Sequence, residues 1–369
     1  MRESYWESRK LAAKRISSRR AFLKGKSAVD AMEELVDGLA RDRTAEKPVP
    51  TPSQIAQAKR DQLLMHYSRS AMACEFQIFL PYDESPNIAD TALAGLELIA
   101  KLEDQLSVYR PLSEVSRINE CAGLGAIRVE AKLFDLLAHA QLLSEQTDGA
   151  FDITSGPLVK AWGFYRREGR VPGDDELREA MSKIGSRGLE LNAEQKSIRF
   201  LREGMEINLG AIGKGYALDQ CADFLSQNGL RDFVLHGGQS SVLARGQRDG
   251  AQAGWNIAIS HPERAEELLC TLELKDQAVG TSGTARQHFF HRGKKYGHLL
   301  DPRTGQPVDH LLSATCIAPS AATADALATA FFVLGEEGTR RYCELHPEVG
   351  AILVHPDRQA GVHVTRINA

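Results

Sequence analysis

Asp325 and Thr329 are the two side chains whose types and spacing best suit metal chemistry. They follow a β-type run, Ala314–Ala318, and a Pro-Ser step, on a segment with a helical pattern. A spacing of four residues places a carboxylate and a hydroxyl on one helical face, one turn apart. Both groups are hard oxygen donors of the kind that Mg²⁺ or Ca²⁺ accepts. The alternative interpretation is an Asp favoured by the helix dipole and a Thr bonded back to a carbonyl.

A glycine-rich turn, Asn208–Gly215, joins an expected strand to an expected helix. Its three glycines let a ligand approach the backbone, and the amides at the helix start, together with Lys214, favour an anion. The spacing departs from the GxxxxGK[ST] pattern of a P-loop. The sequence leaves two interpretations open, which are an anion-binding loop and a tight turn between two elements.

His298 is a candidate general base, because an unperturbed histidine titrates near neutrality. It lies at the end of an expected strand, before a type I turn on Pro302 in which Asp301 can act as the cap. The alternative interpretation is a strand histidine whose ring is held by a structural partner. His288 and His291 are three residues apart, so a strand places them on opposite faces, which argues against a shared metal.

Three further polar loops contain groups that could contact a ligand. They are Gly149–Thr154, where Phe151 could stack on a base and Asp152 could accept from an amino group, the paired-glycine stretch His236–Ser240, and the hydroxyl-rich stretch Thr281–Arg286, which suits phosphate oxygens. Each also has a purely structural interpretation. The first would be a loop buried by Phe151, and the other two would be turns.

The hydrophobic patterns predict an α+β fold without a regular βαβ repeat. The chain has 369 residues, and its globular part is expected to begin near Leu63, after a polar linker rich in proline. Helices are expected at Ile88–Leu106, Lys132–Gln146, Gly215–Leu225, from Ala321 onward and at Glu336–Leu345, and a loop at Gly149–Phe164. Strands are expected at Tyr67–Leu80, Ser197–Phe200, Met205–Leu209, Phe233–Leu235, Ser241–Ala244, Trp255–Ser260, Leu268–Leu274, Gln287–His291, Tyr296–Leu300, Ala314–Ala318, Ala351–Val354 and Val362–Thr365.

Composition and charge exclude several classes of protein. A net charge of −4 gives no broad basic field for nucleic acid, and no apolar run is long enough to form a transmembrane segment. Six scattered cysteines without a CxxC pair indicate buried thiols in a reducing compartment, rather than a disulfide framework or a zinc site.

The first 60 residues are interpreted as a separate charged segment, a basic N-terminal helix followed by a linker. Arg19-Arg20, within Ser18–Lys24, has the form of a twin-arginine export signal. Such a signal needs an apolar stretch next, whereas Gly25–Ala40 carries five charged residues. We therefore expect a cytoplasmic protein in which the twin-arginine stretch is a relic, with periplasmic export as the alternative.

Taken in order, these segments resemble the ApbE family, the FAD:protein FMN transferases. The similar blocks run from about Tyr67 to near the C-terminus and are Ser68–Phe76 around Met72, Leu106–Asn119, Gly149–Phe164, Asn208–Asp219, His236–Gln239, Val279–Gly283, His298–Gly305 and Ala314–Thr329. Any single block is a weak signal, but eight in one order are specific. The resemblance implies an ApbE-like, T-fold-like α+β architecture, two-lobed, with mixed sheets and packed helices.

The resemblance also implies a reaction and the residues that carry it out. Members cleave the pyrophosphate of FAD with one or two divalent ions, usually Mg²⁺, pass FMN to a Thr or Ser hydroxyl of a target protein, often a membrane redox subunit, and release AMP. By this resemblance, Asp325, Thr329 and a main-chain oxygen of Ala211 would bind the metal, and His298 would activate the target hydroxyl. The positions that would contact FAD are Met72, Tyr109, Ala150, Phe151, Asp152, Asn208, Lys214 and Leu300.

The chain departs from the usual family pattern at three places. Met72-Ala73-Cys74 stands where Met-Gly-Thr is usual, Asn208 stands where Asp opens the glycine loop, and Thr284-Ala285 stands where Asp and Tyr are usual. Two alternative functions follow from the same site. Water in place of the hydroxyl would make the chain a FAD pyrophosphatase that yields FMN and AMP, and loss of chemistry would leave a non-catalytic FAD-binding protein.

Overall fold

The computed structural model describes residues 63–83, 85, 87–166, 168–248, 254–284, 287–357 and 361–369. These residues fall within one compact unit, Lys59–Ala369. The helix and linker expected over residues 1–60, with Arg19-Arg20, lie outside the described residues. Among the helices that are described, none combines the length and apolar character needed to cross a membrane.

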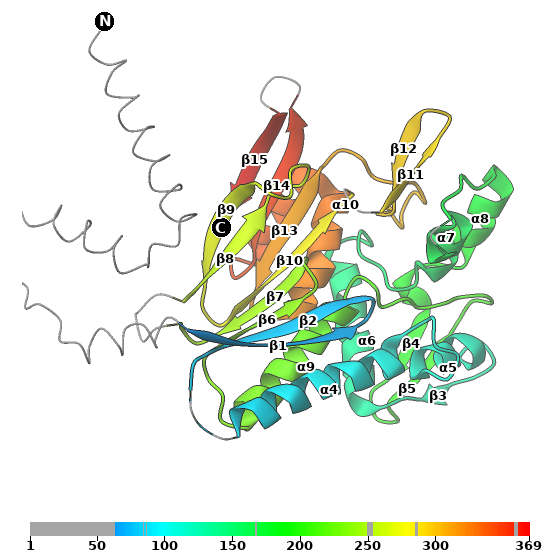
Figure 1. Cartoon of the computed structure of the whole chain (residues 1–369). Coiled ribbons are helices and arrows are strands. Elements are labelled where there is room, and N and C mark those ends of the chain that lie inside the picture. The colour runs from blue at the N-terminus through cyan, green and yellow to red at the C-terminus, as the bar shows by residue number, and fades with distance from the viewer. Residues whose placement is uncertain are drawn as a thin grey trace, which may run out of the picture. The chain divides into compact units, whose positions relative to one another are not determined.

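An eight-stranded sheet forms the centre of the larger lobe (Figure 1). Its order is β1-β2-β6-β7-β10-β13-β14-β15, and each ladder between these neighbours is antiparallel. The strands are β1 Leu64–Ala71, β2 Cys74–Pro81, β6 Phe233–Gly237, β7 Ser241–Arg245, β10 Gln277–Gly283, β13 Ser313–Ala318, β14 Gly350–Asp357 and β15 Gly361–Ile367. The α+β class expected from the sequence is confirmed.

The first strand expected from the sequence, Tyr67–Leu80, is wrong, because the segment is a hairpin. β1 and β2 pair from Leu64↔Pro81 to Ala71↔Cys74, and Met72 and Ala73 form the turn between them. Both turn residues have positive φ, 50° and 58°. A two-residue turn with two positive φ angles matches the twist of a hairpin and favours Gly or Asn, neither of which is present here. The apolar run therefore hides a turn that its residue types do not mark.

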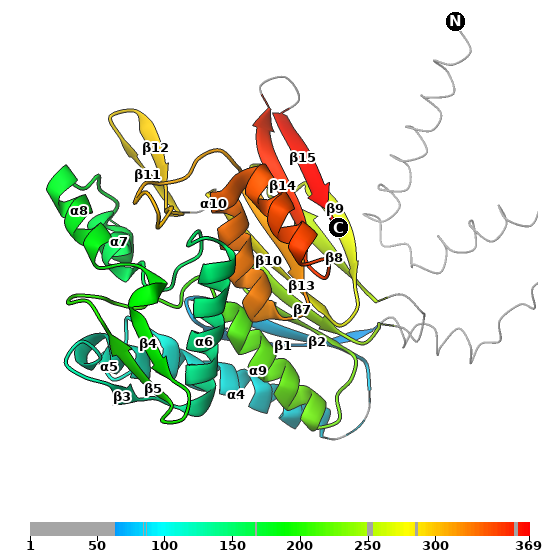
Figure 2. The ribbon, with the colours of Figure 1, turned by 180° about the vertical axis from the view of Figure 1, so that it is seen from behind.

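Three helices cover one face of this sheet, and a fourth packs against them (Figure 2). The three are α4 Ile88–Leu106, α9 Gly213–Gln227 and α10 Ala321–Leu345, and the fourth, α6 Ala131–Gln146, contacts α10. The stripe expected on α4 is buried, since Leu96, Ile99, Leu102 and Leu106 are all in the core. Burial of such apolar stripes is the main term that stabilises the packing of helix on sheet.

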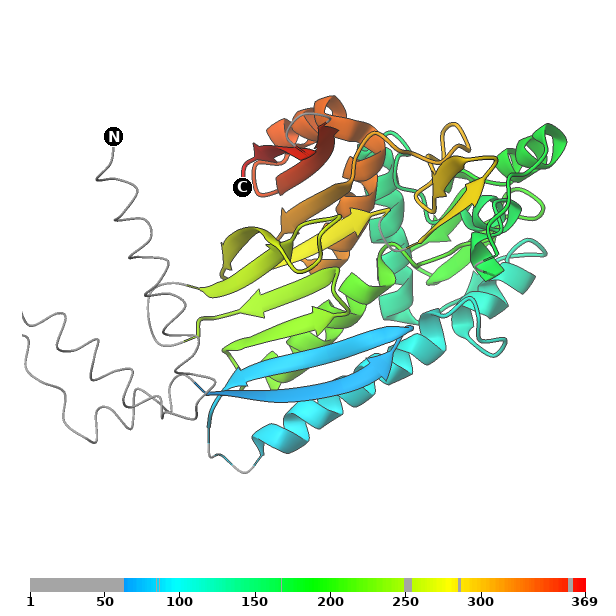
Figure 3. The ribbon, with the colours of Figure 1, turned by 45° about the horizontal axis from the view of Figure 1, so that its top comes forward.

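A hairpin covers the opposite face of the sheet (Figure 3). It consists of β8 Trp255–Ser260 and β9 Leu268–Leu274, both of which were expected as strands. Alternate residues of β8 are buried, and they share one apolar cluster with residues of the central strands, such as Val242 and Ile317. The central strands are therefore buried on both faces, which explains why β13 is buried at every position.

The smaller lobe is built on a three-stranded sheet of order β3-β5-β4. Its elements are β3 Ile127–Arg128, β4 Leu189–Asn192, β5 Ser197–Phe200, α5 Glu114–Cys121, α7 Gly156–Ala161 and α8 Asp174–Ser182, with the short 3₁₀ turns η1 Phe164–Arg166 and η2 Ser186–Gly188. β5 pairs with β4 and β3, and the strand expected at Met205–Leu209 is wrong, because Glu206 makes only an isolated bridge to Ser155. Gly149–Phe164 is also not a loop throughout, because it contains α7.

A second hairpin, β11 His288–His291 with β12 Lys294–Gly297, lies beside the smaller lobe and leads to His298. The strand expected at Tyr296–Leu300 therefore ends three residues early. The six cysteines are all free, and the burial expected for them holds for Cys221, Cys316 and Cys343, whereas Cys74, Cys121 and Cys270 are only half-buried.

Candidate active site between the glycine turn and helix α10

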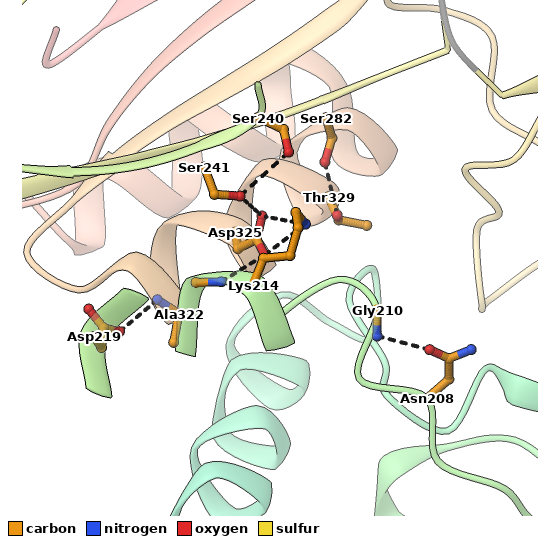
Figure 4. A network of polar contacts seen from close by, with 11 residues as sticks. Asn208, Gly210, Lys214, Asp219, Ser240, Ser241, Ser282, Ala322, Asp325 and Thr329 are labelled. Atoms are coloured by element: carbon orange, nitrogen blue, oxygen red, sulfur yellow. Dashed lines mark hydrogen bonds and ion pairs between the residues drawn. The ribbon is translucent and has the colours of Figure 1, made fainter. Parts of the chain in front are cut away.

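Asp325 is a buried carboxylate on α10 that three groups from other elements contact (Figure 4). The residue is 5 % exposed. Lys214 Nζ lies 3.3 and 3.1 Å from its two carboxylate oxygens, the Gly215 amide donates to Oδ2 at 3.1 Å, and Ser241 Oγ donates to Oδ1 at 2.9 Å. Asp325 lies beyond the first turn of α10, so the helix dipole does not account for its position.

Two glycines let α10 approach its neighbours closely enough to place Asp325. A Cβ at Gly215 on α9 would lie 2.0 Å from the Ala321 carbonyl oxygen, and a Cβ at Gly280 on β10 would lie 2.3 Å from the Ala324 carbonyl oxygen. Only residues without a Cβ fit contacts of this length. The backbone of α10 therefore touches α9 and β10 next to the residue that carries the carboxylate.

Asp219 on α9 fixes the start of α10. Its carboxylate accepts from Ser320 Oγ and from the amides of Ala321 and Ala322, each at 2.8 Å. These donors are groups that the first turn of a helix otherwise leaves unsatisfied. Burial raises the pKa of Asp219, and these hydrogen bonds partly offset that rise. The two helices are thus joined at a second point, and Asp219 positions α10 although sequence reasoning assigned it no role.

Thr329 lies one turn beyond Asp325 and contacts β10. Its Oγ1 is 3.0 Å from Ser282 Oγ (Figure 4). The contact that the structure shows is thus across to the sheet, and not back to a carbonyl of its own helix. With Ser241 on the carboxylate, three hydroxyls and one carboxylate gather between α10 and the sheet. The pair predicted from the spacing is therefore brought together.

The glycine turn predicted as an anion site leads directly into α9. Asn119 fixes the backbone just before this turn, because its Nδ2 donates to the Ile207 carbonyl at 3.0 Å and its Oδ1 accepts from the Ile207 amide at 2.8 Å. Asn208 Oδ1 accepts from the Gly210 amide at 2.8 Å. The start of the helix faces an anion as predicted, but that anion is the side chain of Asp325.

The donors around Asp325 fit a hard divalent ion that keeps positions for substrate oxygens. Among the described residues, no group of three or more His, Cys, Asp or Glu side chains could hold a metal ion. One carboxylate with hydroxyl neighbours is the donor set that Mg²⁺ uses beside substrate phosphates. The carboxylate is paired with the Lys214 ammonium at 3.1 Å, which shows that a positive charge fits there. Ala211 lies in the glycine turn, and no described contact joins it to Asp325 or Thr329, so its role as a ligand stays a prediction.

His298 has one ring nitrogen held by the base of the β11–β12 hairpin. Nδ1 is 3.0 Å from the Gln287 carbonyl oxygen. Because a carbonyl oxygen only accepts, Nδ1 carries the hydrogen, and Nε2 of the neutral ring keeps its lone pair. Burial lowers the pKa of His298, the bond to Gln287 opposes that shift, and the charge of Lys214 adds to it. A neutral ring with Nε2 as the acceptor is therefore the favoured form at neutral pH.

The turn after His298 is structural. The Asp301 carboxylate accepts from the Arg303 amide at 2.9 Å and from Arg303 Nε and Nη2, both at 2.9 Å, so Asp301 caps the turn. Leu300, a predicted FAD contact, is 8 % exposed and packs in an apolar cluster with Trp162 and Phe164.

Ala150, Phe151 and Asp152 point into the fold. Ala150 and Phe151 are buried, which confirms the structural interpretation of this loop and removes stacking of the Phe151 ring on a base. Asp152 accepts from the Thr154 amide and hydroxyl, both at 2.7 Å, and from the Ser186 amide at 2.9 Å. Burial raises the pKa of Asp152, and the hydrogen bonds oppose the rise. This carboxylate joins two loops, and any contact of the segment with a ligand would involve its backbone.

Tyr109 and Met72 remain accessible. Tyr109 is 63 % exposed and stacks on Tyr165, with ring centroids 4.8 Å apart. The Tyr165 hydroxyl donates to the Val108 carbonyl at 3.0 Å, which fixes the position of the Tyr165 ring. Met72 is half-buried in the β1–β2 turn. Together the two tyrosines form an aromatic surface that sequence reasoning recognised only in part.

Sequence reasoning missed residues that act through contacts between distant elements. Ser241 and Ser282 lay in blocks that were noted, but no spacing rule connects them to α10. Cys74 was noted only as a departure from the family pattern and was given no role at the site. Burial raises its pKa, the charge of Lys214 lowers it and that of Asp325 raises it, so the thiol lies in the same electrostatic neighbourhood. The only indication of a role for Ser241 and Ser282 in the sequence was that each lies in or next to a noted stretch that contains glycine and hydroxyl residues.

Comparisons with known proteins identify the family. The model of the ApbE family matches residues 72–353. The chain belongs to the ApbE family. A curated relative from Vibrio cholerae, named FAD:protein FMN transferase, is 35 % identical over 282 residues, which cover 74 % of this chain and 82 % of the relative. A relative of the same name from Haemophilus influenzae is 29 % identical and covers 88 % of this chain and 94 % of its own length.

Solved structures of the ApbE family share the fold. The apo form of the Pseudomonas stutzeri flavinyl transferase ApbE superposes with a TM-score of 0.73 at 28 % identity, covering 82 % of this chain and 94 % of that one. The flavin transferase ApbE from Vibrio cholerae gives a TM-score of 0.70, also at 28 % identity, over 82 % of this chain and 97 % of that one. The chain is therefore an enzyme of the transferase class with the fold of the flavin transferases.

Proposed function

We propose that this ApbE-family chain transfers FMN from FAD to a Thr or Ser hydroxyl of an acceptor protein, in a Mg²⁺-dependent reaction that releases AMP. The names of the relatives support the use of FAD. The observation that carries the proposal is the buried Asp325 carboxylate, which faces Lys214 and the start of α9 beside a cluster of hydroxyls. Such a site can offset the negative charge of a pyrophosphate that is being cleaved.

Asp325, Thr329 and the main-chain oxygen of Ala211 are the residues that would hold Mg²⁺. When bound, the ion would neutralise charge on the phosphate oxygens and orient them. Lys214 supplies a second positive charge at the same place. Its ammonium is 23 % exposed, so it can contact a substrate oxygen without leaving the carboxylate region.

His298 is the residue that would accept the proton. In the proposed step the acceptor oxygen bonds to the phosphorus on the FMN side of the pyrophosphate, the bond to the bridging oxygen breaks, and AMP leaves. The hydroxyl proton passes to Nε2, which is free because Nδ1 is bonded to Gln287. The lowered pKa keeps this nitrogen unprotonated at neutral pH.

The remaining contacts with FAD are proposed at Tyr109, Tyr165, Met72, Asn208 and Leu300. The stacked Tyr109 and Tyr165 offer a face for a planar ring. The acceptor is proposed to be a redox subunit, and the compartment is proposed to be the cytoplasm, with periplasmic export as the alternative.

The test is to incubate the full chain with FAD and MgCl₂, with and without an acceptor domain that carries a single candidate Thr. Chromatography follows AMP, and mass spectrometry follows covalent FMN on the acceptor. AMP with covalent FMN supports the transfer. AMP and free FMN without a covalent product would point to the pyrophosphatase, and neither product would point to a binding protein.

A further inference from the structure

The β11–β12 hairpin, here called the basic hairpin (His288–Gly297), has two different faces. Its register pairs Phe289 with Tyr296 and Phe290 with Lys295. Successive side chains of a strand alternate between faces, so Phe289 and Tyr296 share one face while His288, Phe290 and Lys295 share the other. Phe289 and Tyr296 are partly buried, whereas the other three are exposed.

The inner face is fixed to the smaller lobe by aromatic contacts. The Phe289 and Tyr296 rings stack with centroids 5.3 Å apart. Phe164 lies 5.6 Å from Phe289, and Trp162 lies 5.7 Å from Tyr296. A Cβ at Gly169 would lie 2.5 Å from the Phe289 ring, so the backbone also packs tightly against it. The hairpin is therefore anchored, and its outer face is presented in a set orientation.

The hairpin carries concentrated positive charge, with Lys295 on the outer face, Arg292 in the turn, and Lys294 beside the turn on the same side as Tyr296. Between Gln287 and His298 the chain has three permanent cations, Arg292, Lys294 and Lys295, and no Asp or Glu, although its net charge is −4. Lys294 Nζ lies 5.3 Å from the Tyr296 ring centroid, and none of the three cations pairs with a carboxylate of the described residues. Unpaired cations of this kind attract an acidic partner.

An apolar side chain stands among these cations. Phe290 is 68 % exposed, and His288 contacts its ring edge at 5.6 Å between centroids. An exposed aromatic ring framed by charge is a common anchor for a protein partner, since it adds buried area at little cost in side-chain entropy.

The hairpin leads directly to His298, the proposed general base. His298 directly follows β12, and Gln287 directly precedes β11. The Gln287 carbonyl accepts from both the backbone amide of His298, at 3.2 Å, and Nδ1 of its ring, at 3.0 Å. His298 is therefore held at the base of the hairpin, so a segment bound to the hairpin is anchored close to the residue that would take the proton.

We propose that the basic hairpin is the docking surface for the acceptor protein, and that it binds an acidic segment which flanks the receiving Thr or Ser. The proposal rests on the proposed function, because it assigns the hairpin to the second substrate of that reaction. Phe290 receives an apolar side chain of the acceptor, and Arg292, Lys294 and Lys295 pair with its carboxylates.

The test uses the full chain with FAD and MgCl₂ and three dye-labelled peptides. Each peptide contains one Thr and one Leu, and the flanking residues are Asp and Glu, Gln, or Lys. Fluorescence anisotropy measures binding, so this arm does not depend on whether transfer occurs. The variants are Lys294→Glu with Lys295→Glu, and Phe290→Ser. The control, Lys275→Glu with Arg366→Glu, makes the same change in net charge at two exposed residues on other elements.

We expect the acidic peptide to bind most tightly, with an affinity that falls as salt is added. The double hairpin variant should weaken it on the order of tenfold, as two attractions become repulsions, while the control changes little. Phe290→Ser should weaken all three peptides. With a competent acceptor, the hairpin variants should raise the KM for the acceptor more than the KM for FAD.

Three results would overturn the proposal. The first is equal binding of the acidic and basic peptides by the wild-type chain. The second is an equal rise of both KM values, which would assign the cations to FAD. The third is hairpin-dependent sedimentation with vesicles of anionic phospholipid without a peptide preference, which would assign the surface to a membrane. Failure of transfer with intact peptide selectivity would refute the proposed function instead.

Discussion

Replacing Asp325 by Asn tests the centre of the site, because it removes the charge and keeps the shape. An Asn side-chain oxygen can still accept from Ser241 and from the Gly215 amide. What it cannot do is balance the Lys214 ammonium, which lies 3.1 Å away. The variant therefore isolates the electrostatic part of the interaction from the packing part.

The structure sets the expected magnitudes. Removing one partner of a fully buried ion pair costs about 3–5 kcal/mol, but Lys214 is 23 % exposed and can reach solvent, so we expect about 1–2 kcal/mol of lost stability. The catalytic cost should be larger. The carboxylate would act by holding Mg²⁺, and loss of such a positive charge beside a developing oxyanion costs about 3–4 kcal/mol, or on the order of 10²–10³ in kcat.

The assay is AMP release from FAD across a MgCl₂ titration, together with thermal unfolding. Ser241→Ala is the matched control, because it removes a hydrogen bond to the same carboxylate and keeps the charge, for an expected cost of about 1 kcal/mol. Adding Lys214→Met to Asp325→Asn should recover stability without recovering activity. An Asp325→Asn enzyme within a few-fold of wild type, with an unchanged response to MgCl₂, would refute the assignment of this carboxylate.

Three other substitutions test neighbouring features. His298→Ala should slow transfer by about 10²–10³-fold with little change in the KM for FAD. It should also remove the fall in activity at acidic pH, which we expect below pH 6.5 in the wild type because the pKa of His298 is lowered. If that fall persists in the variant, another group causes it. Gly280→Ala would place its Cβ 2.3 Å from the Ala324 carbonyl oxygen. We therefore expect urea unfolding to show about 1–3 kcal/mol of lost stability, and the activity to fall. Unchanged stability and activity would mean that α10 can move away from β10 without cost. Ala73→Gly should raise the free energy of unfolding by about 1 kcal/mol, and with it the urea midpoint, because glycine adopts the φ of 58° at this position without strain. An unchanged midpoint would show that the turn is unstrained.

The sequence predicted most elements where one periodicity dominates. α4 was predicted with its bounds, and the strands β8, β9, β13 and β14 were found, because alternating or continuous apolar runs are local signals. The β1–β2 turn escaped because Met72 and Ala73 are not turn formers. Met205–Leu209 has strand-like residues, but the Ile207 backbone bonds to the side chain of Asn119, far away in the sequence.

The candidate site was predictable only as separate pieces. The spacing of Asp325 and Thr329 gave the helical pair, and the glycine turn gave Lys214. Their contact depends on the absence of side chains at Gly215 and Gly280, which no local pattern relates to α10. Phe151 was misjudged in one interpretation for the same reason, since burial is decided by elements distant in the sequence.

The bend in α10 has a practical consequence for measuring this enzyme. Gly335, at φ 70° and ψ −167°, separates the half that carries Asp325 from the half that was expected as a helix of its own, Glu336–Leu345. The buried side of the second half still packs on the first, since the Phe331 and Tyr342 rings lie 5.5 Å apart between centroids, so a label belongs on the exposed side. Arg341 and Glu344 are exposed there. We expect a cysteine-linked reporter or a surface tether at either position to leave the activity unchanged, which suits this half of the helix to single-molecule or immobilised-enzyme work.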